Sequence, residues 1–171
     1  MKKLFRLIIF LLVISAFGIC AVARLFPLEY KEIIVYYSEE YDVSPTLVAA
    51  IIKAESNWQT DAVSSAQAKG LMQLSDTTFE WIANENDDIF DPKTNIKYGT
   101  FYFSKLYATY GDTDTALAAY NAGSGNVDKW LIDSRYSKDG KSIDSTPYGE
   151  TNRYMRKINF YEKIYDLIYE F

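Results

Sequence analysis

The chain has 171 residues, of which 49% are hydrophobic and 24% charged, so it is long enough for one globular domain and too apolar to be disordered. The first 24 residues carry four basic and no acidic residues, which leaves 14 basic and 23 acidic residues, a net charge of −9, in the remainder. This acidic balance argues against nucleic acid as a partner, because phosphate binding requires a basic surface. The lack of histidine and the single cysteine, Cys20, exclude zinc sites and Ser-His or Cys-His nucleophiles, and no metal or cofactor is expected.

Residues 1–26 are predicted to direct the chain to a membrane. Residues 1–6 are basic, and Leu7–Ala23 is an uninterrupted run of 17 apolar and small residues. Because this run reaches the lower limit for a membrane span, we interpret it as an uncleaved signal anchor with its basic end in the cytoplasm. The alternative is a signal peptide cleaved after Ala23, since the preceding residues fit a signal-peptidase site. Either interpretation places residues 27–171 outside the cytoplasm, membrane-anchored in the first case and secreted in the second.

The remainder of the chain follows helical periodicity without an alternating β pattern, so the predicted fold class is all-α. A polar, irregular loop is expected over residues 134–147. Helices are expected, in chain order, over Tyr30–Tyr41, from Pro45 to near Glu55, over Gly70–Leu74, from Asp76 through Ile82, from Pro92 to Tyr110, over Asp114–Asn121, over Ser124–Ile132 and from about Gly149 onward.

The helix that begins at Pro45 carries one carboxylate on its apolar face. Glu55 lies seven residues after Val48 and four after Ile51, which is the spacing of residues on one helical face. Near the C-terminal end of a helix, the helix dipole and the apolar surroundings both disfavour ionisation, so the pKa of Glu55 is expected to be raised. A glutamic acid that stays protonated near neutral pH can act as a general acid. The alternative from spacing alone is a solvated glutamate that makes a hydrogen bond at the helix end.

Four short motifs then follow in order. They are Glu55-Ser56 with Ser64, Gly70-Leu71-Met72-Gln73, Ala119-Tyr120-Asn121-Ala122-Gly123 and Glu150-Thr151-Asn152-Arg153-Tyr154. In order and approximate spacing they are similar to the motifs of the lytic transglycosylases. Residues 28–171 therefore resemble the soluble-lytic-transglycosylase (SLT) catalytic domain, a lysozyme-like fold that cleaves the glycan strands of peptidoglycan. The chain departs from the family at Ser75-Asp76, where Met-Pro is usual, which leaves the shape of the neighbouring sugar subsite open.

The resemblance implies a reaction in which one residue makes both proton transfers. Glu55 would protonate the oxygen between N-acetylmuramic acid and N-acetylglucosamine, while the substrate's acetamido group stabilises the cation. Glu55 would then accept the proton of the muramic C6 hydroxyl, which attacks C1. The product would be a 1,6-anhydro end, formed without water, so the enzyme would be a lyase.

The resemblance also implies supporting roles for other residues. Tyr120 would place the carboxyl group of Glu55, and Glu150 would be a buried partner that helps hold Tyr120. Tyr154 is expected only to anchor the last helix. The residues expected to contact substrate are Ser64, Met72, Gln73, Tyr120 and Asn121.

Peptidoglycan strands are the expected partner, the membrane is contacted through the N-terminal segment, and the chain is expected to be a monomer. Two other functions stay open. One is a lysozyme-like muramidase that hydrolyses the same bond with a second carboxylate, for which Asp61 is the candidate. The other is a non-catalytic glycan-binding module in which Glu55 is dispensable.

Overall fold

The computed structural model describes residues 6, 9–10, 18 and 22–171, and over these residues every regular element is a helix. This agrees with the predicted all-α class. The helices are α2 (Lys31–Tyr41), α3 (Pro45–Glu55), α4 (Asp76–Ile82), α5 (Pro92–Tyr110), α6 (Thr113–Ala122), α7 (Ser124–Leu131) and α8 (Gly149–Ile168).

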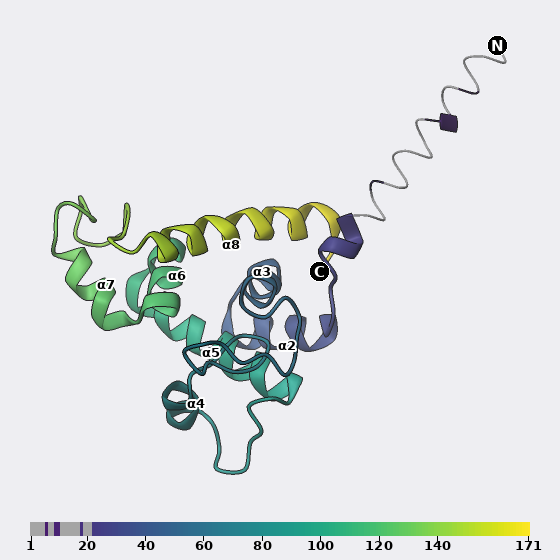
Figure 1. Ribbon diagram of the computed structural model, residues 1–171, viewed down its shortest axis with the longest axis horizontal. Coiled ribbons are helices and arrows are strands. Elements are labelled where there is room, and N and C mark those ends of the chain that lie inside the picture. The colour runs from purple at the N-terminus through teal and green to yellow at the C-terminus, as the bar shows by residue number, and fades with distance from the viewer. Residues whose placement is uncertain (1–5, 7–8, 11–17, 19–21) are drawn as a thin grey trace.

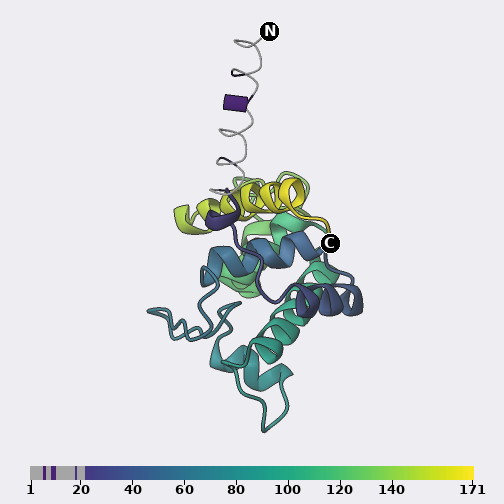
Figure 2. The same ribbon diagram turned by 90° about the vertical axis from the view of Figure 1, so that its right-hand side faces the viewer.

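Helix α3 is the centre of the fold. Every side chain from Thr46 to Ile52 is buried, so the helix is covered around its whole circumference rather than along one stripe. Helix α8 runs along one side of α3 and α2 packs on another, while α5 packs against α2 and α6 (Figures 1 and 2). Because α3 is held on several sides, the position of Glu55, its last residue, is fixed by the core.

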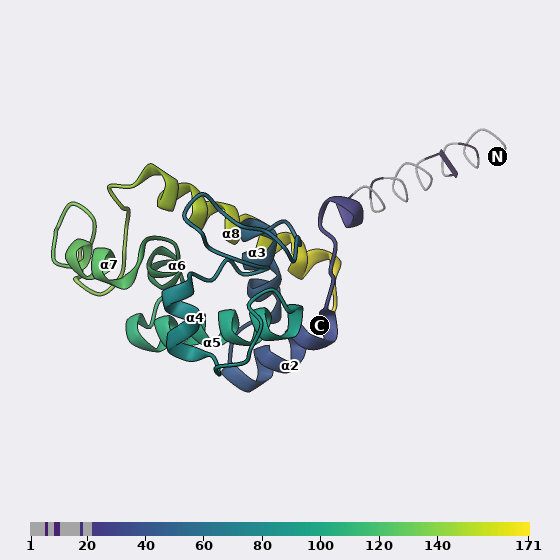
Figure 3. The ribbon, with the colours of Figure 1, turned by 60° about the horizontal axis from the view of Figure 1, so that its bottom comes forward.

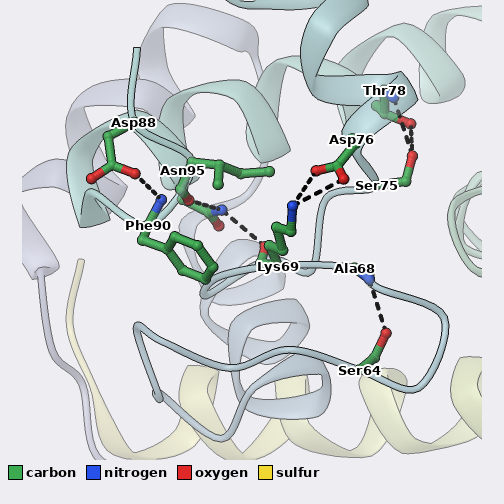
Figure 4. Close-up of polar contacts among 10 residues, drawn as sticks. Ser64, Ala68, Lys69, Ser75, Asp76, Thr78, Asp88, Phe90 and Asn95 are labelled. Carbon is green, nitrogen blue, oxygen red and sulfur yellow. Dashed lines mark hydrogen bonds and ion pairs between the residues drawn. The ribbon is translucent and has the colours of Figure 1, made fainter.

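The helix ends follow the signals in the sequence. Asp91 caps α5, its carboxylate accepting a hydrogen bond from the backbone N–H of Thr94 at 2.8 Å, and Gly111 ends the helix with φ of 68°. The Ser75 hydroxyl caps α4 in the same way, at 3.1 Å from the backbone nitrogen of Thr78 (Figure 4). Short-range chemistry therefore fixes where these elements begin and end.

The predicted short helix over Gly70–Leu74 is wrong. Lys69 and Leu74 form an antiparallel bridge with two backbone hydrogen bonds of 2.9 and 3.0 Å, and a turn joins them. Gly70 and Gln73 both adopt positive φ, 77° and 49°, which is incompatible with a right-handed helix. The Lys69 ammonium also pairs with Asp76 at 2.7 Å, which ties the turn to α4 (Figure 4).

The chain enters the domain at the C-terminal end of α8. Residues 22–25 are helical, and the Phe26 ring packs edge-on against Tyr161 with centroids 5.3 Å apart. The hydroxyls of Tyr169 and Tyr165 donate hydrogen bonds to the carbonyls of Phe26 and Pro27, at 2.7 and 2.9 Å. Helix α7 and the loop of residues 132–148 lie at the opposite end of α8 (Figure 3).

The predicted membrane segment, residues 1–26, lies mostly outside the described residues. Within the part that the structure describes, no helix has both the length and the apolar character that a membrane crossing requires.

Candidate active site

Glu55 is the last residue of α3, and its carboxyl group lies between α3 and α8. Its Oε1 accepts a hydrogen bond from the hydroxyl of Tyr154, on α8, at 2.5 Å. One turn further along α8, the Lys157 ammonium donates to the backbone carbonyl of Ala54 at 2.9 Å. The site is therefore assembled from two helices that are far apart in the sequence and packed side by side in the fold.

The pKa of Glu55 is raised from 4.5 to about 7. Burial is the largest cause, because a carboxylate loses hydration when protein atoms surround it. The hydrogen bond from Tyr154 and the positive charge of Lys157 lower the pKa and offset part of this effect. Among the described residues, no other carboxylate contributes to the shift. Glu55 is thus a single acid that can both hold and release a proton near neutral pH.

The prediction that the Tyr120 hydroxyl positions the carboxyl group of Glu55 is wrong, because another tyrosine donates that hydrogen bond. The Tyr120 hydroxyl donates to the backbone carbonyl of Met72 at 2.7 Å, and the hydroxyl on Glu55 belongs to Tyr154. Tyr120 is nevertheless a neighbour of the acid, since its pKa is raised well above the ordinary value, first by burial and then by the charge of Glu55. From the sequence, Tyr154 is predicted only to anchor α8. Its place opposite Glu55 arises from the packing of α8 on α3, which the local sequence does not indicate.

A clamp that the sequence did not predict holds the turn at Met72. Asn95, on α5, accepts a hydrogen bond from the backbone N–H of Met72 at 2.7 Å and donates to the carbonyl of Ile89, also at 2.7 Å. It also donates to the carbonyl of Lys69 at 3.1 Å (Figure 4). A Cβ atom on Gly70 would lie 2.2 Å from the Asn95 amide nitrogen, so glycine is required for this close approach. The only signal in the sequence was a polar residue beside the apolar stripe of α5.

Gly99 on α5 provides the space that Met72 occupies. A Cβ atom at this position would lie 2.4 Å from the sulfur of Met72 and 2.7 Å from its Cβ. The Met72 side chain is fully buried, so its position depends on this close helix approach. The backbone carbonyl of Met72, which accepts from Tyr120, is thereby held at a fixed place near Glu55.

Ser64 and Gln73 brace the loop between α3 and α4. The Ser64 hydroxyl oxygen accepts a hydrogen bond from the backbone N–H of Ala68 at 3.0 Å (Figure 4). The Gln73 amide donates to the carbonyls of Ala62 and Gly70, at 3.1 and 2.9 Å. In these contacts Ser64 acts as acceptor and Gln73 as donor, which leaves the hydroxyl proton of Ser64 and the amide oxygen of Gln73 able to bond a ligand.

Two residues of the predicted site lie at its edge. The side-chain amide oxygen (Oδ1) of Asn121 accepts a hydrogen bond from the hydroxyl of Thr151 at 2.8 Å, which joins α6 to α8, and Asn121 is otherwise exposed. Glu150 is also exposed, so the predicted burial of this residue is wrong. The inward face of α8 begins at Thr151 and continues through Tyr154 and Met155, and Glu150 lies at the edge of that stripe.

The fold and this single, partly buried acid at the end of a central helix define a lysozyme-like helical domain. The family model for the transglycosylase SLT domain matches residues 32–143, and the chain belongs to this family. Tyr154 lies beyond the matched segment, although it completes the site.

Curated relatives support the same family. The chain is 32% identical over 150 residues to a soluble lytic murein transglycosylase of Salmonella typhimurium, covering 82% of this chain and 23% of that protein. It is 29% identical to membrane-bound lytic murein transglycosylase C of Edwardsiella ictaluri, covering 80% of this chain and 46% of that one. The chain therefore spans about a quarter to a half of the length of these relatives.

Solved structures show the same fold. The 70-kDa soluble lytic transglycosylase of Escherichia coli superimposes with a TM-score of 0.73 at 27% identity, covering 85% of this chain and 25% of that one. An inactive glutamate-to-glutamine mutant of lytic transglycosylase Slt from Pseudomonas aeruginosa gives a TM-score of 0.70 at 28% identity, covering 83% and 24%.

Proposed function

We propose that this domain is a peptidoglycan lytic transglycosylase that cleaves the β-1,4 bond between N-acetylmuramic acid and N-acetylglucosamine without water. The observation that carries the proposal is Glu55, a partly buried acid with a pKa of about 7, in a domain of the SLT family. The names of the curated relatives support the substrate, since murein is peptidoglycan.

The proposed reaction uses Glu55 twice. In the first step its carboxyl proton passes to the bridging oxygen as the bond from C1 to that oxygen breaks, and the substrate's acetamido group stabilises the resulting cation. In the second step the carboxylate accepts the proton of the C6 hydroxyl of the same muramic residue as that oxygen bonds to C1. The acid is restored, and the product carries a 1,6-anhydro end.

A pKa near 7 suits this double role, because a residue that must give and then take a proton works best when neither form is strongly favoured. Tyr154 stabilises the carboxylate formed between the two steps, since its hydroxyl donates to Oε1. Among the residues that the structure describes, no second carboxylate contributes to the pKa of Glu55, and Asp61 is exposed. Both observations favour a transglycosylase over a hydrolase that uses two carboxylates.

The sugar subsite is proposed to lie beside Glu55, along the loop between α3 and α4. Ser64 and Gln73 would bond the acetamido group or the sugar hydroxyls with the donor and acceptor atoms that their loop contacts leave available. Met72 and Tyr120 would form the wall next to Glu55, because the Tyr120 hydroxyl and the Met72 carbonyl are bonded to each other there. Asn121 and Glu150 would contribute at the edge.

The domain, residues 27–171, is proposed to act outside the cytoplasm as a monomer, where its substrate lies. Residues 1–26 would anchor it to the cell membrane, an inference that rests on the basic start and the apolar run of Leu7–Ala23. One group of relatives is named membrane-bound, which is consistent with this placement.

The test is digestion of purified peptidoglycan by the full chain in mild detergent, followed by mass spectrometry of the released muropeptides. We expect products with 1,6-anhydromuramic ends, and Glu55→Gln is expected to reduce their release by about 10²-fold or more because it removes the transferable proton. Glu39→Gln, at an exposed position on α2, is the matched control and should keep full activity.

Two outcomes would contradict the proposal. Reducing muramic ends, heavier by one water, would identify a hydrolase and direct attention to Asp61. A folded protein that binds the sacculus and releases nothing, in both the wild type and Glu55→Gln, would identify a glycan-binding module.

A further inference from the structure

The outward face of α8 has a charge pattern opposite to that of the domain as a whole. Arg153, Arg156, Phe160 and Leu167 point away from the buried side of the helix and lie within about 60° of one another at 100° per residue. Phe160 is 59% exposed and Leu167 83% exposed. With their neighbours they form what we call the outer stripe, which consists of Arg153, Arg156, Phe160, Lys163, Ile164 and Leu167.

The outer stripe combines three cations with three apolar side chains and contains no acid, although residues 25–171 carry a net charge of −9. The acids of the second half of α8, Glu162 and Asp166, lie on the flank that faces the start of α3. They line a hollow there with Ser44 and Thr46, and Lys163 lies at the border between this hollow and the outer stripe. A helical face of apolar and basic side chains is typical of helices that lie in the plane of a membrane surface.

The entry of the chain into the domain holds α8 close to the predicted membrane segment. Phe26 is fixed to α8 through the Tyr161 ring and the Tyr169 hydroxyl, whereas the apolar run ends at Ala23. Three residues span at most about 10 Å when fully extended. An apolar run that enters a bilayer therefore leaves the C-terminal end of α8 within about 10 Å of the bilayer surface.

The side chains around this junction match such a position. Leu25 is 63% exposed, and Arg24 beside it is exposed and basic. The Lys53 ammonium lies 5.5 Å from the centre of the Phe26 ring. One acid, Glu29, also lies near this end, because its charge contributes to the raised pKa of Tyr165, and its side chain is exposed. The junction thus adds two cations, an exposed leucine and one exposed acid beside the outer stripe.

We propose that the outer stripe of α8 docks on the surface of a bilayer rich in anionic phospholipid. The cations contact the lipid phosphates, and Phe160, Ile164 and Leu167 enter the headgroup boundary. This goes beyond the proposed catalytic function, which concerns the opposite, inward face of α8. A second copy of this chain fits the stripe poorly, because a two-fold interface would bring like charges together without an acid to pair with them.

The test places a fluorophore on the outer stripe of the full chain. Phe160→Cys, in a Cys20→Ser background, is labelled with bimane and reconstituted into vesicles that contain brominated lipid as quencher. One set of vesicles contains phosphatidylglycerol and the other only phosphatidylcholine. We expect strong quenching at position 160 in the anionic vesicles, loss of that quenching at high salt, and little quenching in the neutral vesicles.

Two matched variants separate docking from simple tethering. A label at Glu80→Cys, on α4 and away from α8 (Figure 1), should stay unquenched in both vesicles. Reversing Arg156 and Lys163 to Glu should reduce quenching at position 160 at least about twofold, whereas the same reversal at the exposed Lys93 and Lys105 of α5 should not.

Three results would overturn the proposal. One is equal quenching in neutral and anionic vesicles, and another is no quenching in either. The third is a change in the fluorescence of the position-160 label that follows protein concentration in the absence of lipid, because it would identify a second copy of the chain as the occupant. Peptidoglycan cleavage is measured in the same samples, so a loss of docking can be recognised apart from a loss of catalysis.

Discussion

Glu55 keeps its proton near neutral pH because burial raises its pKa by more than two contacts to the carboxylate lower it. The Tyr154 hydroxyl and the Lys157 ammonium both stabilise the carboxylate, yet the pKa still rises to about 7. The balance matters for a residue that alternates between acid and base. Without the two contacts Glu55 would hold its proton too strongly to serve as a good donor.

Removing the hydroxyl of Tyr154 tests this balance. Tyr154→Phe deletes the hydrogen bond that lowers the pKa of Glu55, so the pKa should rise. We expect the alkaline limb of the pH–activity profile to move up by about one pH unit, since a hydrogen bond to a charged group contributes about 1.5–3 kcal/mol, partly offset by relaxation. The profile is measured from initial rates of muropeptide release between pH 5 and 9.

Tyr37→Phe is the control for Tyr154→Phe, because Tyr37 is a buried tyrosine of α2 outside the site. Its profile should match that of the wild type. An alkaline limb that stays in place or moves to lower pH in Tyr154→Phe would show that this hydroxyl does not govern the ionisation of Glu55.

The residue that carries the acid was predictable, and its partner was not. Glu55 lies on a strongly apolar face of a local element, so a spacing argument finds it. The partner depends on how α8 packs against α3, and Tyr154 is one of 15 tyrosines with nothing local to distinguish it. The same limit explains the wrong assignment of the Glu55 contact to Tyr120, which lies close but bonds Met72.

At the scale of elements, the Asn95 clamp holds the turn between α3 and α4 to α5. Its three hydrogen bonds reach the backbone N–H of Met72, the carbonyl of Ile89 and the carbonyl of Lys69, and the last of these also accepts a hydrogen bond from the backbone N–H of Leu74. Leaving a buried polar group unsatisfied costs about 1–3 kcal/mol. This single side chain therefore contributes heavily to the position of Met72.

We expect Asn95→Ala to lower the free energy of unfolding by about 2–4 kcal/mol, measured by urea denaturation. Asn86→Ala, at an exposed loop position, should change it by less than about 0.5 kcal/mol. If Asn95→Ala changed the free energy of unfolding no more than Asn86→Ala does, water would be able to replace the amide, and the Asn95 clamp would contribute little to stability.

Most elements could be predicted because their ends are set by local chemistry. The Asp91-Pro92 start, the Ser75 cap and the Gly111 stop each act through neighbouring residues. The prediction failed at Gly70–Leu74, where an antiparallel bridge and the Asn95 contacts override a sequence that would tolerate a helical turn. Contacts from a distant helix were decisive there, and no short window contains them.

For the whole molecule, the raised pKa of Glu55 links stability to pH. Between pH 4.5 and about 7 the folded state keeps a proton on Glu55 that the unfolded state has released. The free energy of unfolding must therefore fall as pH rises through this window. Once pH exceeds 7, Glu55 has lowered the free energy of unfolding by about 3 kcal/mol relative to its value below pH 4.5.

Urea denaturation of the wild type and of Glu55→Gln at pH 4.5 to 8 isolates this contribution. Other groups, such as Glu162, whose pKa is also raised by burial, are present in both proteins and cancel in the difference. Relative to the wild type, Glu55→Gln should gain stability steadily as pH rises. A difference that does not change with pH would mean that Glu55 titrates normally in the folded protein.

The dependence of Glu55 on Tyr154 also sets an order in time. The two residues are 99 positions apart, and α3 lacks its main cover until α8 has been made. At a synthesis rate of about 5–20 residues per second, Glu55 leaves the ribosome about 5–20 seconds before its partner. During that interval the nascent chain has an acid without its donor on an uncovered helix. The cell-wall cleavage proposed for this domain would therefore begin only when folding is complete, and the nascent chain would be harmless before that point.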